Sequence, residues 1–244
     1  MVLKNKPKER FLSIYDHLAE LRIRLLICLI FVVIFTITSY CFVDRIRLFI
    51  TAPVREHLVF VSLPEAFLVN LKIAALSGIL VSIPVILQQL WSFVIPGLTK
   101  SERIAAFFLV VGSILFFTLG VIFAFFIIVP FTVSFFLKFS SAHLKPMITF
   151  SNYVSFVSGI LFAFGIVFQL PLVVFILAQL GLISHELLSE NRANAIVFIF
   201  IIAAILTPPD IISQILLAIP LLLLYEFSML MAKLAGRKRT SISA

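Results

Sequence analysis

The sequence predicts an all-α integral membrane protein with six transmembrane helices, on the grounds of composition, hydropathy and the length of its apolar runs. Of its 244 residues, 62% are hydrophobic and 12% are charged, whereas soluble domains have about 45–50% apolar and about 25% charged residues. The mean hydropathy is +1.22. The apolar runs are long and unbroken and do not alternate as barrel strands do, so the spans must be helices.

The first element is a charged amphipathic segment directly before the first apolar run. Asp16, Glu20 and Arg24 recur at i, i+4 spacing, so a helix would place them on one face. Glu20 can simply pair with Arg24, and Arg22 and Arg24 can act as interfacial anchors. The first span is predicted to follow at residues 23–42.

The other spans are predicted at residues 62–94, 104–133, 154–177, 193–206 and 211–231, with polar loops between them. The second begins with Ser62-Leu-Pro-Glu65, which has the spacing of a capping box. The fifth reaches only about 21 Å, short for a hydrocarbon core of about 30 Å. Pro84, Pro171 and Pro220 lie inside even-numbered spans, where each removes a backbone donor and can kink its helix.

The distribution of positive charge predicts the orientation. Six spans place both termini on one side, and 13 of the 19 Lys and Arg residues lie on that side. These are Lys4, Lys6, Lys8, Arg10, Arg22, Arg24, Lys100, Arg103, Arg192, Lys233, Arg237, Lys238 and Arg239. Both termini are therefore expected to be cytoplasmic. The chain is expected to form one membrane domain over residues 1–244, with short basic tails at 1–13 and 233–244.

The composition and motifs argue against several classes of function. The net charge of +8 comes mostly from segments that flank spans, so it indicates orientation and not nucleic-acid binding. The sequence has no Ser/His/Asp grouping, no metal-ligand cluster and no Gly-rich phosphate loop, so we expect no enzyme activity, no metal and no cofactor. No span carries a charge near its middle, as an ion-coupled transporter usually would.

Gln169 is the polar residue that lies deepest in the predicted spans. An unsatisfied amide in hydrocarbon costs about 1–3 kcal/mol, so Gln169 should face protein or water. It can form an interhelical hydrogen bond or belong to a functional polar site. At the span ends, Glu102 and Asp210 each follow a threonine, Thr99 and Thr207, with capping-box spacing, and capping is their simplest role.

Two carboxylates are more informative together than either is alone. Glu20 and Glu102 both lie at the predicted cytoplasmic surface among basic residues. Carboxylates bind guanidinium groups through bidentate, charge-assisted hydrogen bonds. The pair therefore suggests a site for a basic ligand.

Four motifs carry a resemblance to a known family. They are His17-Leu-Ala-Glu-Leu-Arg-Ile-Arg-Leu25, Pro84-Val-Ile-Leu-Gln-Gln-Leu-Trp-Ser-Phe93, Phe164-Gly-Ile-Val-Phe-Gln-Leu-Pro171 and Leu206-Thr-Pro-Pro-Asp-Ile-Ile-Ser-Gln214. In this order, and over nearly the whole chain, they resemble TatC, the six-span core subunit of the twin-arginine protein translocase.

The resemblance implies a cup-shaped bundle that binds the twin-arginine signal peptides of folded precursors. It implies that the chain acts together with the single-span subunits TatA and TatB and that the proton-motive force drives transport. The chain would form a homo-oligomer within a larger complex, surrounded by membrane lipids. Because no transit peptide is evident, the expected location is the bacterial cytoplasmic membrane. Carried over by position, Glu20 and Glu102 receive the two signal arginines, with Leu21, Arg22 and Phe93 beside them.

The resemblance also assigns residues elsewhere. Pro53 and Phe67 match positions that shape an extracytoplasmic cap, and Asp210 falls in the turn between the last two spans. Thr207 and Gln214 lie where the family docks its small partner helices. The family often has Glu where this chain has Gln169, a neutral amide that can hydrogen-bond a partner but cannot titrate at that depth.

The sequence leaves two alternative functions. A small-molecule permease would need an internal polar path. Inverted repeats and discontinuous helices would indicate such a path, and they would be stronger support for a permease than any feature of this sequence. An intramembrane enzyme would need a nucleophile or a metal set, which the sequence does not offer.

Overall fold

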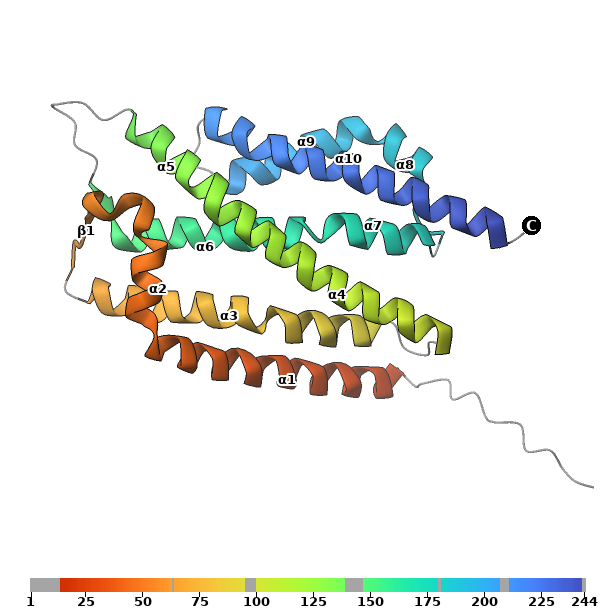
Figure 1. The fold of residues 1–244 in the computed structure, drawn as a ribbon, viewed down its shortest axis with the longest axis horizontal. Coiled ribbons are helices and arrows are strands. Elements are labelled where there is room, and N and C mark those ends of the chain that lie inside the picture. Colours follow the sequence, from red (N-terminus) through yellow and green to blue (C-terminus); the bar gives the residue numbers. More distant parts are fainter. Residues whose placement is uncertain are drawn as a thin grey trace, which may run out of the picture.

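The computed structural model describes residues 14–62, 64–94, 100–138, 147–179, 181–206 and 211–242. Its helices lie side by side in an elongated bundle (Figure 1). They are α1 (Ile14–Cys41), α2 (Val43–Ile50), α3 (Glu65–Val94), α4 (Lys100–Phe123), α5 (Val129–Leu137), α6 (Phe150–Val167), α7 (Leu170–Gln179), α8 (His185–Glu190), α9 (Arg192–Leu206) and α10 (Ile211–Ile242). The remaining elements are a 3-10 helix η1 (Ala52–His57), a π-helical turn η2 (Ala124–Ile128) and the two-residue strands β1 (Leu58–Val59) and β2 (Ile148–Thr149).

The described chain passes along the bundle in alternating directions, as α1, α3, α4 with α5, α6 with α7, α9 and α10 (Figure 1). Among the described residues, four stretches are long and apolar enough to cross a membrane: His17–Cys41, Glu65–Phe93, Phe107–Leu137 and Phe150–Gln179. The apolar helix Arg192–Ile205 is shorter, as the sequence predicted for the fifth span. The helical membrane fold predicted from composition is confirmed.

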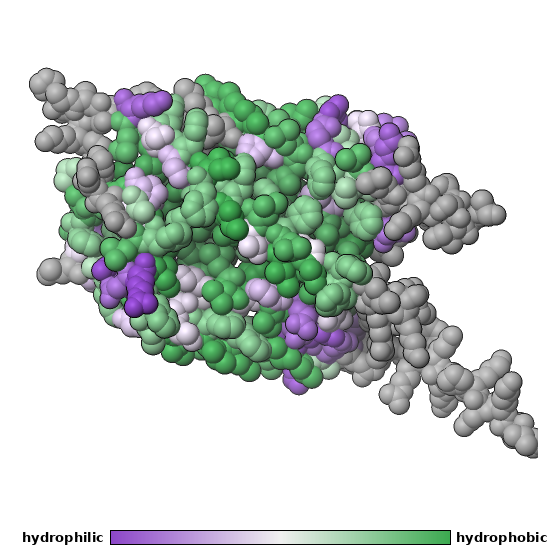
Figure 2. All heavy atoms as spheres, viewed as in Figure 1, coloured by the Kyte–Doolittle hydropathy of each residue, from purple (hydrophilic) through white to green (hydrophobic). Residues whose placement is uncertain are grey.

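Hydropathy varies along the bundle in the way that a membrane requires. Apolar residues cover the middle of the face in view, and polar residues gather toward the two ends (Figure 2). The start of α1 and the end of α10 lie at the same end (Figure 1). That end, which also holds α8, is called the terminal end below, and the opposite end, with α2 and β1, is called the distal end.

Two of the passes are interrupted just before a proline. The third changes to the π-helical turn η2 ahead of Pro130, and the fourth breaks at Phe168 and Gln169, ahead of Pro171. Proline has no N–H, so the carbonyl four residues earlier loses its helical partner and the helix adjusts there. By contrast, α3 and α10 continue through Pro84 and Pro220.

Glycines allow close approach where helices cross. A Cβ on Gly78 of α3 would collide with backbone atoms of Thr36 in α1, and one on Gly120 of α4 would lie 2.7 Å from the Phe164 carbonyl oxygen in α6. Small residues at such crossings let helix backbones pack closely within a membrane. These contacts fix α1 against α3 and α4 against α6.

At the distal end, segments that were predicted as loops contain short helices and strands. The segment after α1 forms α2 and η1 instead of a loop, and the predicted loop 134–153 is shortened because α5 extends to Leu137 and α6 begins at Phe150. Strands β1 and β2 pair in parallel, with Leu58 opposite Ile148. The segment between α7 and α9, also predicted as a loop, contains the short helix α8.

Candidate ligand site at the terminal end of α1 and α3

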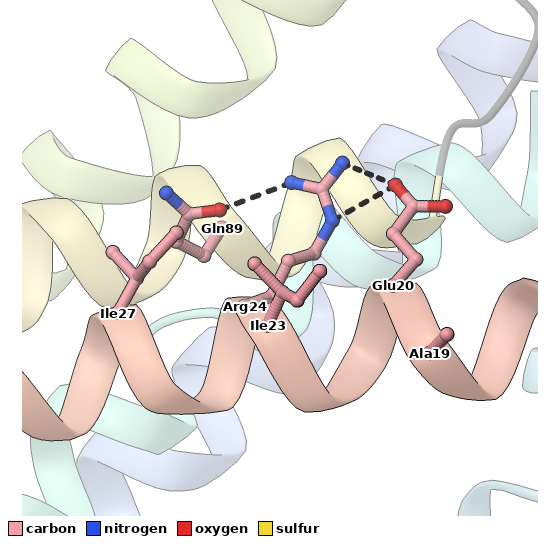
Figure 3. Close-up of a pocket in the computed structure, with 6 residues that line it drawn as sticks. All are labelled: Ala19, Glu20, Ile23, Arg24, Ile27 and Gln89. Carbon is pink, nitrogen blue, oxygen red and sulfur yellow. Dashed lines mark hydrogen bonds and ion pairs between the residues drawn. The ribbon is translucent and has the colours of Figure 1, made fainter.

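The packing of α1 along α3 brings the charged start of α1 beside the last turns of α3. Together they line an open pocket of about 420 Å³ (Figure 3). Its lining residues are Ala19, Glu20, Ile23, Arg24 and Ile27 of α1 and Gln89 of α3. The pocket thus combines a carboxylate, a guanidinium and an amide with apolar walls.

Arg24 lies between the other two polar groups and binds both (Figure 3). Its Nε and Nη2 donate to Oε1 of Glu20 at 3.0 and 2.5 Å, and its Nη1 donates to Oε1 of Gln89 at 3.0 Å. The ion pair is the i, i+4 pair expected from the sequence, and the bond to Gln89 connects α1 to α3.

Among the described residues, the second carboxylate oxygen of Glu20 is an acceptor in this pocket without a donor. Both Arg24 contacts go to Oε1, and Oε2 has no hydrogen bond within the described part of the chain. The side chains of Arg24 and Glu20 are 22% and 34% exposed, so solvent or a ligand can reach them. Apolar neighbours reduce the local dielectric and strengthen any further charge interaction here.

The other residues predicted to lie beside this site are at the same end. The rings of His17 in α1 and Phe93 in α3 stack with centroids 4.5 Å apart. Leu21 is partly buried and Arg22 is exposed. Glu102 lies in the first turn of α4, close to the end of α3 in the chain, but its side chain is outside the described residues.

Two of the other described carboxylates at the terminal end already have partners. Glu226 of α10 pairs with Arg192 at the start of α9. The pKa of the Glu186 carboxyl in α8 is lowered by its own backbone N–H and by a hydrogen bond from the Ser184 side chain. Among these described carboxylates, Glu20 combines an open oxygen with a place in a pocket.

Gln169 forms the interhelical hydrogen bond that was one of its two predicted roles. Its Nε2 donates to the Ser113 carbonyl oxygen at 3.0 Å, which joins the break between α6 and α7 to α4. The Ser113 hydroxyl accepts a 2.6 Å bond from Nε1 of Trp91 in α3. Oε1 of Gln169 is buried and has no protein partner among the described residues, so the second predicted role, a functional polar site, stays open.

The residues assigned to a cap and to partner docking are only partly described. Pro53 is partly buried in η1, and Phe67 is exposed near the start of α3, both at the distal end. Nε2 of Gln214 donates to the Phe200 carbonyl oxygen at 3.0 Å and so joins α10 to α9. Thr207 and Asp210 lie outside the described residues.

Sequence reasoning missed Gln89 and gave Arg24 only the roles of ion-pair partner and anchor. Gln89 stands in the motif Pro84–Phe93, next to another glutamine, Gln88. Polar residues in the last turns of a span are a signal by which such a site residue could be predicted. The sequence could not say which of the two amides faces α1, because that depends on the rotation of α3 against its neighbour.

Comparison with known proteins agrees with the fold and with the motifs. Residues 16–220 match the family model described as Sec-independent protein translocase protein (TatC). The chain is 43% identical over 243 residues to the Sec-independent protein translocase protein TatC of Carboxydothermus hydrogenoformans, covering 98% of each chain. It is 38% identical to the protein of the same name from Aquifex aeolicus, covering 93% of this chain and 97% of that one.

The fold is also that of a solved relative. A crystal structure of a twin-arginine translocase receptor TatC superposes with a TM-score of 0.81 at 38% identity, covering 90% of this chain and 99% of that one. Sequence and structure therefore agree in identifying this chain as a multi-pass membrane protein of the TatC family of Sec-independent protein translocases.

Proposed function

We propose that this chain is the receptor and core subunit of the twin-arginine translocase, and that Glu20 receives an arginine of the signal peptide. The observation that carries this is the α1–α3 pocket, where one oxygen of the Glu20 carboxylate accepts no hydrogen bond from the described residues and lies beside apolar walls. Glu102 is the second receiving carboxylate, with Leu21, Arg22 and Phe93 as neighbouring contacts.

Guanidinium geometry explains why two arginines would be required. Arginine is planar and can present two parallel N–H groups to a carboxylate, whereas lysine is a compact point charge without this fork. Each charge-assisted hydrogen bond contributes about 1.5–3 kcal/mol. A receptor built on two carboxylates therefore favours paired arginines over paired lysines.

The rest of the assembly follows from the same assignment. The chain would act as one membrane domain over residues 1–244, in the bacterial cytoplasmic membrane with both termini cytoplasmic, as a homo-oligomer in a larger complex. Thr207 and Gln214 would contact the single-span partners TatA and TatB. Pro53, Phe67 and Asp210 would shape the extracytoplasmic side, and transport of the folded precursor would draw on the proton-motive force.

The proposal is tested by export in cells that carry this chain as their TatC. A folded fluorescent reporter is fused to a twin-arginine signal peptide or to its twin-lysine version, and the exported fraction is measured. We expect Glu20→Gln to lower export of the twin-arginine reporter about tenfold or more, since it loses a charge-assisted interaction.

The matched control is Glu186→Gln, which removes the same charge from α8 at the same end of the bundle. Export should be unchanged in that variant. Equal losses in the two variants, or full export with Glu20→Gln, would contradict the assignment of Glu20.

A further inference from the structure

We propose that Arg24 is a resident guanidinium that occupies the Glu20 carboxylate in the absence of ligand, and that a signal-peptide arginine binds by exchange with it. Gln89 is the acceptor that retains Arg24 after the exchange. The proposal rests on the proposed function of Glu20, and it makes Arg24 and Gln89 determinants of affinity and specificity.

The contact between Arg24 and Glu20 uses the carboxylate incompletely. Nε and Nη2 of Arg24 converge on the single oxygen Oε1, whereas a bidentate pair uses both carboxylate oxygens. Both residues belong to α1 and are one turn apart, so the Arg24 guanidinium reaches the Glu20 carboxylate along the surface of the same helix (Figure 3). A guanidinium that enters through the open pocket is not attached to α1 and can donate to both carboxylate oxygens.

Gln89 supplies what an exchange needs, which is a second acceptor for the displaced group. Its Oε1 already accepts Nη1 of Arg24 at 3.0 Å. When Arg24 leaves Glu20, this bond from α3 can be kept, so the displaced charge stays hydrogen-bonded. A guanidinium without any acceptor in this partly buried place would be costly.

The exchange distinguishes arginine from lysine. An ammonium group can bind the open Oε2 of Glu20 as a point charge, without moving Arg24. A bidentate guanidinium also needs Oε1, which Arg24 occupies. Removing Arg24 should therefore help a twin-arginine peptide more than a twin-lysine peptide, although both peptides carry the same charge.

The test measures dissociation constants of fluorescent twin-arginine and twin-lysine signal peptides, by anisotropy, on the full chain in phosphatidylethanolamine and phosphatidylglycerol nanodiscs. We expect Arg24→Gln to tighten twin-arginine binding about two- to fivefold, the range that release of a partly exposed ion pair gives. Twin-lysine binding should tighten less. Lys233→Gln, which removes an exposed positive charge from α10, should change neither peptide selectively.

A double-mutant cycle tests the role of Gln89. Gln89→Leu should weaken twin-arginine binding in the wild-type chain and should have no effect when Arg24→Gln is already present. Equal tightening of both peptides by Arg24→Gln would mean relief of charge repulsion only, and weaker binding would mean that Arg24 merely positions Glu20. Either result would overturn the exchange.

Glu20→Gln separates the exchange from the proposed function on which it rests. If Glu20→Gln leaves twin-arginine affinity unchanged, the proposed receptor role of Glu20 fails. If Glu20→Gln weakens binding but Arg24→Gln gives no selective gain, only the exchange fails.

Discussion

The carboxylate of Glu65 accepts three backbone hydrogen bonds from two separate segments of the chain. Its Oε2 accepts the backbone N–H groups of Val61 at 2.7 Å and Ser62 at 3.4 Å, and its Oε1 accepts that of Ser151 at 3.1 Å. The bond from Ser62 was predictable, because Ser62 and Glu65 have capping-box spacing. The bond from Ser151 was not, because it joins the starts of α3 and α6, which are far apart in the sequence.

We expect Glu65→Ala to destabilise the protein by about 1–3 kcal/mol, because it leaves the Ser151 N–H without its acceptor. Glu65→Gln keeps one acceptor oxygen and should lie between the alanine variant and the wild type. The measurement is equilibrium unfolding in mixed detergent micelles. Glu190→Ala, at an exposed position at the end of α8, should change stability by less than about 0.5 kcal/mol, and a similar loss there would contradict the role given to Glu65.

At the site, the sequence singled out Glu20 of α1, and the family resemblance added Phe93 of α3, but neither pointed to Gln89 of α3. Glu20 could be singled out because charge is rare in this chain and its i, i+4 partner lies on the same helix. Gln89 joins the site only through the packing of α3 against α1. Because the Glu102 side chain is not described, its pairing with Glu20 stays a prediction.

The crossing of α1 and α3 is the element-scale feature on which the pocket depends. Helix α1 has few buried side chains of its own, and Gly78 lets it lie directly against α3. A side chain at Gly78 would separate α1 from α3. Because α1 carries Arg24 and α3 carries Gln89, the separation would also affect the pocket.

Gly78→Ala should therefore destabilise the protein by about 1–3 kcal/mol, as overpacking of a tight contact does, and weaken binding of the twin-arginine peptide. Gly159→Ala is the matched control, because a Cβ there has nothing within 4 Å. It should be neutral or slightly stabilising. Thermal unfolding and peptide affinity, measured on both variants, check this prediction, and equal tolerance at the two glycines would contradict it.

Helix interruptions and short helices were harder to predict than the spans. Pro84, Pro171 and Pro220 all lack an N–H, yet the fourth pass alone is broken at one of them. Residue type alone therefore does not decide the outcome, and the prolines differ in packing, since Pro171 is fully buried and Pro84 is exposed. Helices α2 and α8 lie in polar segments, where short amphipathic helices are easily mistaken for loops.

For the whole molecule, long apolar runs were sufficient to predict the alternating passes, and the asymmetry of Lys and Arg predicts their orientation. Asp44 lies in α2 at the distal end, and Lys233 lies in the second half of α10, toward the terminal end (Figure 1). The charge rule predicts that the terminal end is cytoplasmic. These two exposed positions therefore report on opposite sides of the membrane.

We expect Asp44→Cys to react with a membrane-impermeant maleimide added to intact spheroplasts, in a chain whose native Cys28 and Cys41 are replaced by alanine. Lys233→Cys in the same background should react only after the membrane is permeabilised. Labelling yields on gels give the readout. Reaction of Lys233→Cys but not of Asp44→Cys in intact spheroplasts would mean the opposite orientation.

The central claim is that the pocket beside Glu20 binds the twin-arginine motif, and site-specific photo-crosslinking tests it most directly. A photoreactive residue is placed at Ile23, which lines the pocket and is 54% exposed, so that Glu20 itself stays intact. We predict capture of a twin-arginine precursor in membranes, little capture of its twin-lysine version, and loss of capture when Glu20→Gln is added. Equal capture of both precursors, or capture that survives Glu20→Gln, would contradict the claim.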